Sequence, residues 1–153
     1  MSRSHEIYRG VVFPWQCDHI GHMNIMWYVG KFDEATRHLF SELGLTPNFL
    51  RENDRGMAGV QQNISYKREL FAGDIVTVHS AVLEMKDRVV RFTHEMCKAD
   101  TDELAAATTL TAVHLDKIAR RACAFPQSVR EKGAVLLAQV DSLDAAPLRH
   151  VGS

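Results

Sequence analysis

The 153-residue sequence has few cysteines and no excess of either charge. Its three cysteines, Cys17, Cys97 and Cys123, are too few and too scattered for a disulfide framework or a zinc ribbon. The 18 Lys and Arg residues nearly balance the 19 Asp and Glu residues, so the net charge of −1 creates no field that would attract nucleic acid or an acidic membrane. We therefore predict a protein with neither nucleic-acid nor membrane partners.

Long hydrophobic runs are also missing. The opening residues, "MSRSHEIYRG", lack the apolar run of a signal peptide, and no segment approaches the length needed to span a membrane. No glycine-rich phosphate loop follows a strand, and no G-x-S-x-G nucleophile elbow occurs. These absences predict a cytoplasmic protein that is neither a nucleotide-binding enzyme of that kind nor a serine hydrolase.

What remains is an ordinary globular composition, with 46% hydrophobic and 24% charged residues. A chain of this length is large enough to bury its own core. We expect residues 1–140 to form a single domain. Residues 141–153 are rich in Ala, Asp and Pro, and we expect them to form a flexible C-terminal tail.

One long amphipathic helix is predicted over residues 24–43. Asn24 is a good N-cap, and Gly44 suits the helix end. The apolar residues between them recur at spacings of three and four, which marks one face of a helix. They are Ile25, Tyr28, Val29, Phe32, Ala35, Leu39, Phe40 and Leu43.

Alternating apolar and polar residues predict strands on both sides of this helix. A short helix is expected after Pro126, and a loop is expected around Pro47. The predicted strands cover residues 5–13, 60–69, 75–85, 89–98 and 104–115, and the short helix covers 126–139. This order predicts an α+β fold in which a curved antiparallel β-sheet wraps around the long central helix, because the sheet is the only large surface that can cover the helix's apolar stripe.

The segment "CDHIGHMNIMWY", residues 17–28, places polar side chains directly before this helix. A helix N-terminus carries unpaired N–H groups and a partial positive charge. It can hold the oxygen of a polarised carbonyl while a nearby carboxylate, here Asp18, attacks the carbon or activates water. Gly21 lets the backbone turn closely. Alternatively, Asp18 only satisfies loop N–H groups, and Trp15 only packs in the core instead of forming a pocket wall.

A metal site in this segment is a second interpretation. Asp18, His19 and His22 could form a carboxylate–histidine cluster, but no matching ligand pair follows downstream, so we predict no metal. His94 and His114 lie in apolar alternations, which is typical of core or interface histidines.

The spacing Asp18-x-x-Gly21-His22-x-Asn24-x-x-x-Tyr28, followed by Phe32, Glu34 and Ala35, resembles the N-terminal signature of the hotdog-fold acyl-CoA thioesterases. The 4-hydroxybenzoyl-CoA thioesterase class is the most similar group, and "RRACAFPQSVRE" is similar to the family's exit from its last strand. The resemblance implies a hotdog fold, an acyl-CoA substrate and no cofactor. It also implies self-association as a homodimer or homotetramer, with sites at the interface.

The resemblance also implies roles for individual residues. Asp18 matches the family's catalytic carboxylate, which acts as nucleophile or general base. Ile25 stands where the helix offers a backbone N–H to the thioester oxygen. Gly21 matches the loop glycine, and His22 and Asn24 agree with the broader G-H-x-N variant of the family and not with the apolar residues of the aryl enzyme.

Three further positions are expected to bind substrate. Tyr28 matches the family's helix tyrosine, and Trp15 flanks the site. Asp33 falls where the hydroxybenzoyl enzyme uses a carboxylate to hold the phenol hydroxyl.

The predicted function is hydrolysis of a small or medium acyl-CoA, aromatic acyl groups included. Two alternatives remain. One is a non-catalytic acyl-CoA-binding or regulatory hotdog protein. The other is a hotdog hydratase or dehydratase, although the helix motif of those enzymes is missing. The acyl group and the basic residues that hold the CoA phosphates stay open.

Overall fold

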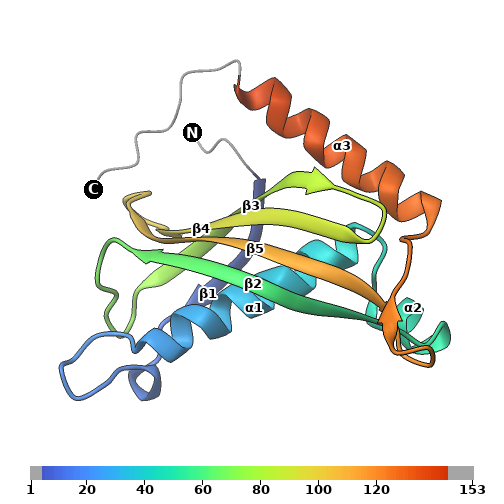
Figure 1. The fold of residues 1–153 in the computed structure, drawn as a ribbon. Helices are drawn as coiled ribbons and strands as arrows, with labels where there is room; N and C mark the ends of the chain where they lie inside the picture. Colours follow the sequence, from blue (N-terminus) through green and yellow to red (C-terminus); the bar gives the residue numbers. More distant parts are fainter. Residues whose placement is uncertain (1–4, 145–153) are drawn as a thin grey trace.

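A curved antiparallel sheet forms most of the molecule, and helix α1 crosses one of its faces (Figure 1). The computed structural model describes residues 5–144. The strands are β1 (His5–Val11), β2 (Arg55–Tyr66), β3 (Ile75–Met85), β4 (Val89–Lys98), β5 (Leu104–Asp116) and β6 (Arg121–Ala122), in the order β1-β3-β4-β5-β2 with β6 beside β5. The helices are α1 (Ile25–Glu42), α2 (Pro47–Glu52) and α3 (Gln127–Asp144), with a single 3₁₀ turn at Pro14–Gln16. None of the helices within this range is long and apolar enough to cross a membrane.

The predicted order is confirmed in part, and β3 and β4 have the predicted bounds. Two elements, α2 and β6, were not predicted, and the last helix, predicted to be short, has the same 18 residues as α1. Two predictions between residues 44 and 69 were wrong. Strand β2 covers residues 55–66 and not 60–69, because glycines interrupt the alternation at its start. The expected loop around Pro47 contains α2, whose start is capped by Thr46 Oγ1 accepting from the Phe49 N–H at 3.1 Å.

Helix α1 begins after Asn24, as predicted, and Gly44 beyond its end has a φ of +94°, which suits a helix C-terminus. The buried face of α1 also includes Lys31 and Thr36, which the predicted stripe did not contain, and it does not include Ile25. Ile25 is 60% exposed. Lys31 is buried instead, and burial lowers its pKa. Its Nζ donates to the Val11 carbonyl on β1 at 3.0 Å, and this hydrogen bond offsets part of the cost of burying the amine.

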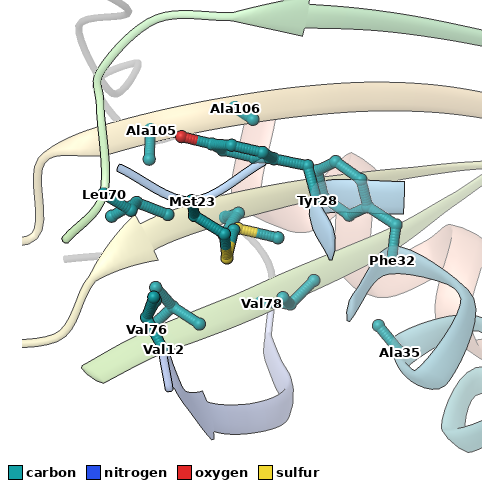
Figure 2. Close-up of a cluster of buried hydrophobic side chains, with 11 residues drawn as sticks. Val12, Met23, Tyr28, Phe32, Ala35, Leu70, Val76, Val78, Ala105 and Ala106 are labelled. Carbon is teal, nitrogen blue, oxygen red and sulfur yellow. The ribbon is translucent and has the colours of Figure 1, made fainter. Parts of the chain in front are cut away.

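The core next to the start of α1 joins the helix to the sheet (Figure 2). Its buried members are Val12, Met23, Tyr28, Phe32, Ala35, Leu70, Val76, Val78, Met96, Ala105 and Ala106. Met23 comes from the loop before α1 and lies among these side chains. The loop is therefore anchored in the core immediately before the helix begins.

Helix α3 lies beside β3, and its N-terminal half approaches the end of α1 (Figure 1). A Cβ at Gly133 would come within 2.3 Å of Met85 Cε, the flexible end of that side chain, so a larger residue here would require the Met85 side chain to shift. The helix runs to Asp144, beyond the predicted 126–139, because the first helix-breaking residue of the tail is Pro147. Residues 145–153 of the expected flexible tail lie outside the described residues.

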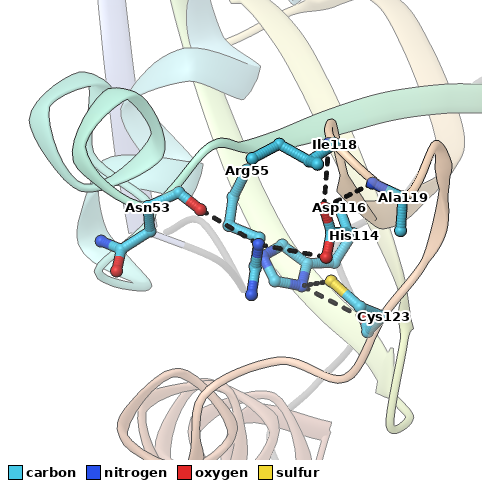
Figure 3. Close-up of polar contacts among 7 residues, drawn as sticks. All are labelled: Asn53, Arg55, His114, Asp116, Ile118, Ala119 and Cys123. Atoms are coloured by element: carbon cyan, nitrogen blue, oxygen red, sulfur yellow. Dashed lines mark hydrogen bonds and ion pairs between the residues drawn. The ribbon is translucent and has the colours of Figure 1, made fainter.

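At the far end of β5, a polar network fixes the turn into β6 (Figure 3). The Asp116 carboxylate accepts from the N–H groups of Ala119 and Ile118, which lower its pKa, and it pairs with Arg55 at 3.5 Å. His114 is buried, and its Nδ1 lies 3.1 Å from the Cys123 carbonyl oxygen. This network holds the chain in place between the sheet and α3.

Candidate active site

The loop before α1 is closed on itself by backbone hydrogen bonds. Cys17 and Met23 form an antiparallel bridge, the Asp18 N–H donates to the His22 carbonyl at 3.1 Å, and the Gly21 N–H donates to the Asp18 carbonyl at 3.0 Å. Gly21 has a φ of +98°, a conformation that only glycine adopts without strain. The loop therefore holds Asp18 in one place.

The Asp18 carboxylate lies beside the helix start and accepts two hydrogen bonds. The Ile20 N–H donates to Oδ1 at 3.0 Å, and Asn24 Nδ2 donates to Oδ2 at 3.4 Å. Asn24 Oδ1 in turn accepts from the Met26 N–H at 2.9 Å, so Asn24 is the predicted N-cap. One amide side chain therefore joins the carboxylate to the first turn of α1.

Ile25 is the first residue of α1. Within residues 5–144 no hydrogen bond is recorded for its backbone N–H, whereas the next two N–H groups are bonded to Asn24. An amide at this position can donate to a carbonyl oxygen and adds the partial positive charge of the helix end.

A cavity of about 440 Å³ opens over this helix end. It is lined by Asp18, Ile20, His22, Met23, Asn24, Ile25, Tyr28, Tyr66, Lys67, Arg68 and Glu69. Asp18, His22, Asn24, Ile25 and Tyr28, which the sequence assigned to one site, all line it, and Gly21 lies in the adjoining loop.

Tyr28 forms part of the cavity wall. Its hydroxyl donates to the Arg68 carbonyl at 3.0 Å, and its ring meets the Tyr66 ring edge to face, 5.2 Å between centroids. Burial raises the Tyr28 pKa to about 12. The phenol therefore stays neutral at physiological pH, and it positions the wall without serving as a base.

Trp15 and Asp33 lie elsewhere in the single chain. Both line a separate hollow of about 580 Å³ together with Trp27, whose ring meets that of Trp15 edge to face at 4.9 Å. Asp33 is exposed and lies 3.6 Å from Arg37 on the next turn of α1. The fold of one chain does not bring these two predicted substrate-binding residues to the Asp18 cavity.

His22 faces the loop between β2 and β3. Its Nε2 lies 3.6 Å from Glu69, and its ring meets Phe71 edge to face. His19 is exposed. Among residues 5–144, the one His, Cys and carboxylate group compact enough to share an ion includes none of Asp18, His19 and His22.

Sequence reasoning missed the opposite wall of the cavity. Tyr66, Lys67, Arg68 and Glu69 follow α1 by about 25 residues, at the end of β2. Their sequence pattern is typical of an exposed strand end. They lie here because β2 pairs with β5, and the pairing continues beyond β2 as the Lys67 N–H donates to the Ala105 carbonyl at 2.7 Å. No local signal in the sequence could have assigned them to the site.

Comparison with known proteins places the chain among thioester-cleaving families. A family model described as "Thioesterase-like superfamily" matches residues 12–133. A curated relative, the L-carnitine dehydrogenase/betainyl-CoA thioesterase of Agrobacterium fabrum, is 26% identical over 137 residues, which are 89% of this chain and 27% of the relative. The chain therefore spans about a quarter of that relative's length.

Several solved structures share the fold. A Staphylococcus aureus protein solved in complex with CoA superposes with a TM-score of 0.84 at 20% identity, over 89% of this chain and 86% of that one. A 1,4-dihydroxy-2-naphthoyl-CoA thioesterase from Synechocystis gives 0.75 at 18% identity, over 84% and 95%. A gentisyl-coenzyme A thioesterase gives 0.74 at 25% identity, over 84% and 99%.

Proposed function

The chain belongs to the thioesterase-like superfamily, and from that membership we propose that it is an acyl-CoA thioesterase of hotdog type whose reaction depends on Asp18. One observation carries this proposal. The Asp18 carboxylate lies in a cavity at the start of α1 and is bonded to Asn24, the residue that caps the same helix. A carboxylate and a helix N-terminus in one cavity can together cleave a thioester, one as nucleophile or base and the other as donor to the oxyanion.

The proposed reaction begins with the thioester oxygen at the Ile25 N–H, where the helix end stabilises the developing negative charge. If Asp18 acts as nucleophile, its oxygen bonds to the carbonyl carbon and the C–S bond breaks. CoA then leaves as the thiolate, and water hydrolyses the mixed anhydride. If Asp18 acts as general base, it takes a proton from water, which attacks the carbon directly and expels the same thiolate. Both routes release one carboxylic acid and one CoA.

The cavity lining contains groups that can hold an acyl group with a positive charge. Tyr66 offers an exposed aromatic ring, and the carboxylates of Asp18 and Glu69 lie in the same lining, which also contains the cations Lys67 and Arg68. Aromatic faces and carboxylates together suit a quaternary ammonium group. The Agrobacterium relative is named for betainyl-CoA, whose acyl group is of this kind. We therefore propose a small quaternary-ammonium acyl group as the preferred substrate, bound without any cofactor.

A second copy of the chain is proposed to complete the site as a homodimer or homotetramer. Large apolar side chains lie at the start of α1 and in the loop before it, and Ile20, Ile25 and Met26 are all more than half exposed. Exposed apolar groups gathered at one place are typical of an interaction surface. In such an assembly Asp33 and Trp15 would be supplied to the site by the neighbouring copy.

The test compares the hydrolysis of two isosteric acyl-CoA substrates by wild type and by two Asp→Asn variants. Betainyl-CoA and 3,3-dimethylbutanoyl-CoA have the same shape and differ in the charge of one atom, and a thiol reagent reports CoA release from either. We expect wild type to prefer betainyl-CoA, and Asp18→Asn to lose about 10²–10⁴-fold in kcat on the better substrate while it still binds. Asp87→Asn, an exposed aspartate that pairs with Arg130, is the control and should retain full activity.

The two parts of the proposal fail separately. An Asp18→Asn variant with near-normal turnover would place the chemistry elsewhere. Equal turnover of the charged and neutral substrates would refute the acyl preference and leave the thioesterase assignment intact.

A further inference from the structure

Three potential metal ligands meet on the sheet, away from the Asp18 cavity. They are His79 on β3, Cys97 on β4 and Asp102 in the turn between β4 and β5. One ligand atom from each residue lies within 4.8 Å of the other two. Imidazole, thiolate and carboxylate are three of the side-chain types that bind zinc in proteins.

The strand register explains why these residues meet. His79 pairs with Glu95 and Thr77 pairs with Cys97 across β3 and β4, and paired residues share one face of a sheet. The alternate residue Val78 packs against α1 in the core, so His79 and Cys97 face the opposite side. The sheet therefore separates this cluster from α1.

The burial and hydrogen bonding of these three residues resemble those of ligands in a metal site. Cys97 is fully buried and His79 is 9% exposed, whereas Asp102 is at the surface. His79 Nε2 lies 3.0 Å from Thr77 Oγ1, and an oxygen partner on the far ring nitrogen is what orients metal-binding histidines. Asp102 has a φ of +59°, and its N–H donates to the Lys98 carbonyl at 2.8 Å, which fixes the turn that carries its carboxylate.

We propose that His79, Cys97 and Asp102 bind one zinc ion, with His79 Nδ1 as the imidazole ligand and water in the fourth position. A thiolate disfavours magnesium and calcium, which prefer oxygen ligands, and mixed nitrogen, sulfur and oxygen donors favour zinc. The nearby carboxylate of Glu95 adds negative charge on the same face of the sheet. The ion would tie the β4–β5 turn to β3, and its role is structural because α1 and Asp18 are on the other side.

The sequence alone predicted no metal. The three ligands are spaced by 18 and 5 residues and match no zinc motif, so only the pairing of β3 with β4 reveals them. The segment that the sequence did single out, Asp18, His19 and His22, contributes nothing to this cluster.

The experiment is a cobalt titration of the full-length, metal-stripped chain, because cobalt(II) reports thiolate ligation by its near-ultraviolet charge-transfer absorption. We expect saturation at one ion per chain, competition by zinc and a zinc-dependent rise in Tm. Cys97→Ser should abolish the absorption band. Asp102→Asn, an exposed position that should not disturb folding, should weaken binding by about tenfold or more. Hydrolysis of the best acyl-CoA should be unchanged by chelators.

The chain supplies a matched control for a cysteine beside a histidine. Cys123 Sγ lies 3.4 Å from His114 Nδ1, but the compact metal-binding group among residues 5–144 does not include this pair. Cys123→Ser should bind cobalt as wild type does. The proposal is overturned if no thiolate absorption appears at micromolar cobalt, or if Cys123→Ser rather than Cys97→Ser removes it. It is also overturned if Asp102→Asn binds cobalt with the same affinity as wild type.

Discussion

At the scale of single residues, Asn24 links the stability of the fold to the proposed chemistry. Its Oδ1 caps α1 at Met26, and its Nδ2 donates to Asp18. An aspartate could make the cap as well, but it would place a second negative charge against Asp18. An amide is therefore the side chain that can serve both partners.

Replacement of Asn24 should separate these two contributions. Asn24→Ala should lower the unfolding free energy by about 1 kcal/mol and reduce kcat by about tenfold, because both hydrogen bonds are lost. Asn24→Ser restores a capping oxygen but cannot reach Asp18 as a donor amide does. We expect it to regain the stability, measured by urea denaturation, without regaining kcat. Recovery of kcat along with stability would show that the contact with Asp18 is unimportant.

The sequence could predict the residues on one side of the site because they are close together in the chain. Asp18, Asn24 and Ile25 lie within eight positions and next to a clear helix start. Glu69 could not be predicted in the same way, because its position depends on the pairing of β2 with β5. The predicted role of Asp33 is untested by the single chain, where its partner is Arg37.

At the scale of secondary-structure elements, a buried histidine joins α1 to two strands. Thr36 Oγ1 on α1 donates to the Phe32 carbonyl, so it must accept from the Nε2–H of His94 on β4, at 2.9 Å. His94 Nδ1 then accepts from the Ser80 hydroxyl on β3. The ring is neutral and fully hydrogen-bonded, which confirms the prediction that His94 is a core histidine.

This histidine should make the fold sensitive to acid. Burial lowers the His94 pKa from 6.5 to about 3, so between these values the unfolded chain binds a proton that the folded chain does not. The contribution of His94 to the unfolding free energy is fully present above pH 6.5. It is lost as the pH falls, by up to ~1.4 kcal/mol per pH unit. Unfolding free energies measured from pH 7.5 to 4 should therefore fall less steeply in His94→Gln than in wild type.

The control for this measurement is His38→Gln on the exposed side of α1, which should keep the wild-type pH dependence. His94→Gln is also expected to be less stable at pH 7.5, by about 1–3 kcal/mol, because the network is disturbed. If His94→Gln and wild type have parallel pH profiles, His94 does not titrate on unfolding as proposed.

Elements with a clear period could be predicted from the sequence, and those without one could not. Strands β3 and β4 alternate over part of their length and lie between clear turn sequences, so their bounds agree with the prediction. Helix α2 has only six residues, too few to show a helical period, and it was missed although Thr46 and Pro47 are favourable at a helix start. Lys31 was missed because a lysine on a helix is normally solvated, and only the nearby Val11 carbonyl explains its burial.

At the scale of the whole molecule, β1 and β2 are the two edge strands of the sheet within residues 5–144, and β2 is the longer of the two. Strand β2 pairs with β5 on one side, and within residues 5–144 no strand pairs with its other side. It also carries exposed apolar side chains, including Val60 and Tyr66. An unpaired edge of this kind is a surface on which a second copy can extend the sheet.

A charge on this edge should weaken self-association. We expect wild type to sediment at micromolar concentration as a dimer or larger, and Val60→Lys to shift toward the monomer and lose turnover with it. Val60 is 60% exposed, and Val135 on α3 is 58% exposed, so Val135→Lys is a control of equal size and exposure. A wild type that sediments as a monomer would contradict both the edge and the shared site.

In the closed loop before α1, the backbone groups that hold Asp18 in place are separate from the side chains that can set the acyl preference. Backbone bonds from Asp18 and Met23 hold the loop's shape, and they do not depend on which side chains stand at positions 19 and 20. Yet Ile20 lines the cavity and is largely exposed, as is His19. Random replacement at these two positions should therefore yield libraries in which most members fold and keep the carboxylate in place while acyl preference varies. The loop offers selection a way to change specificity at little cost to the rest of the protein.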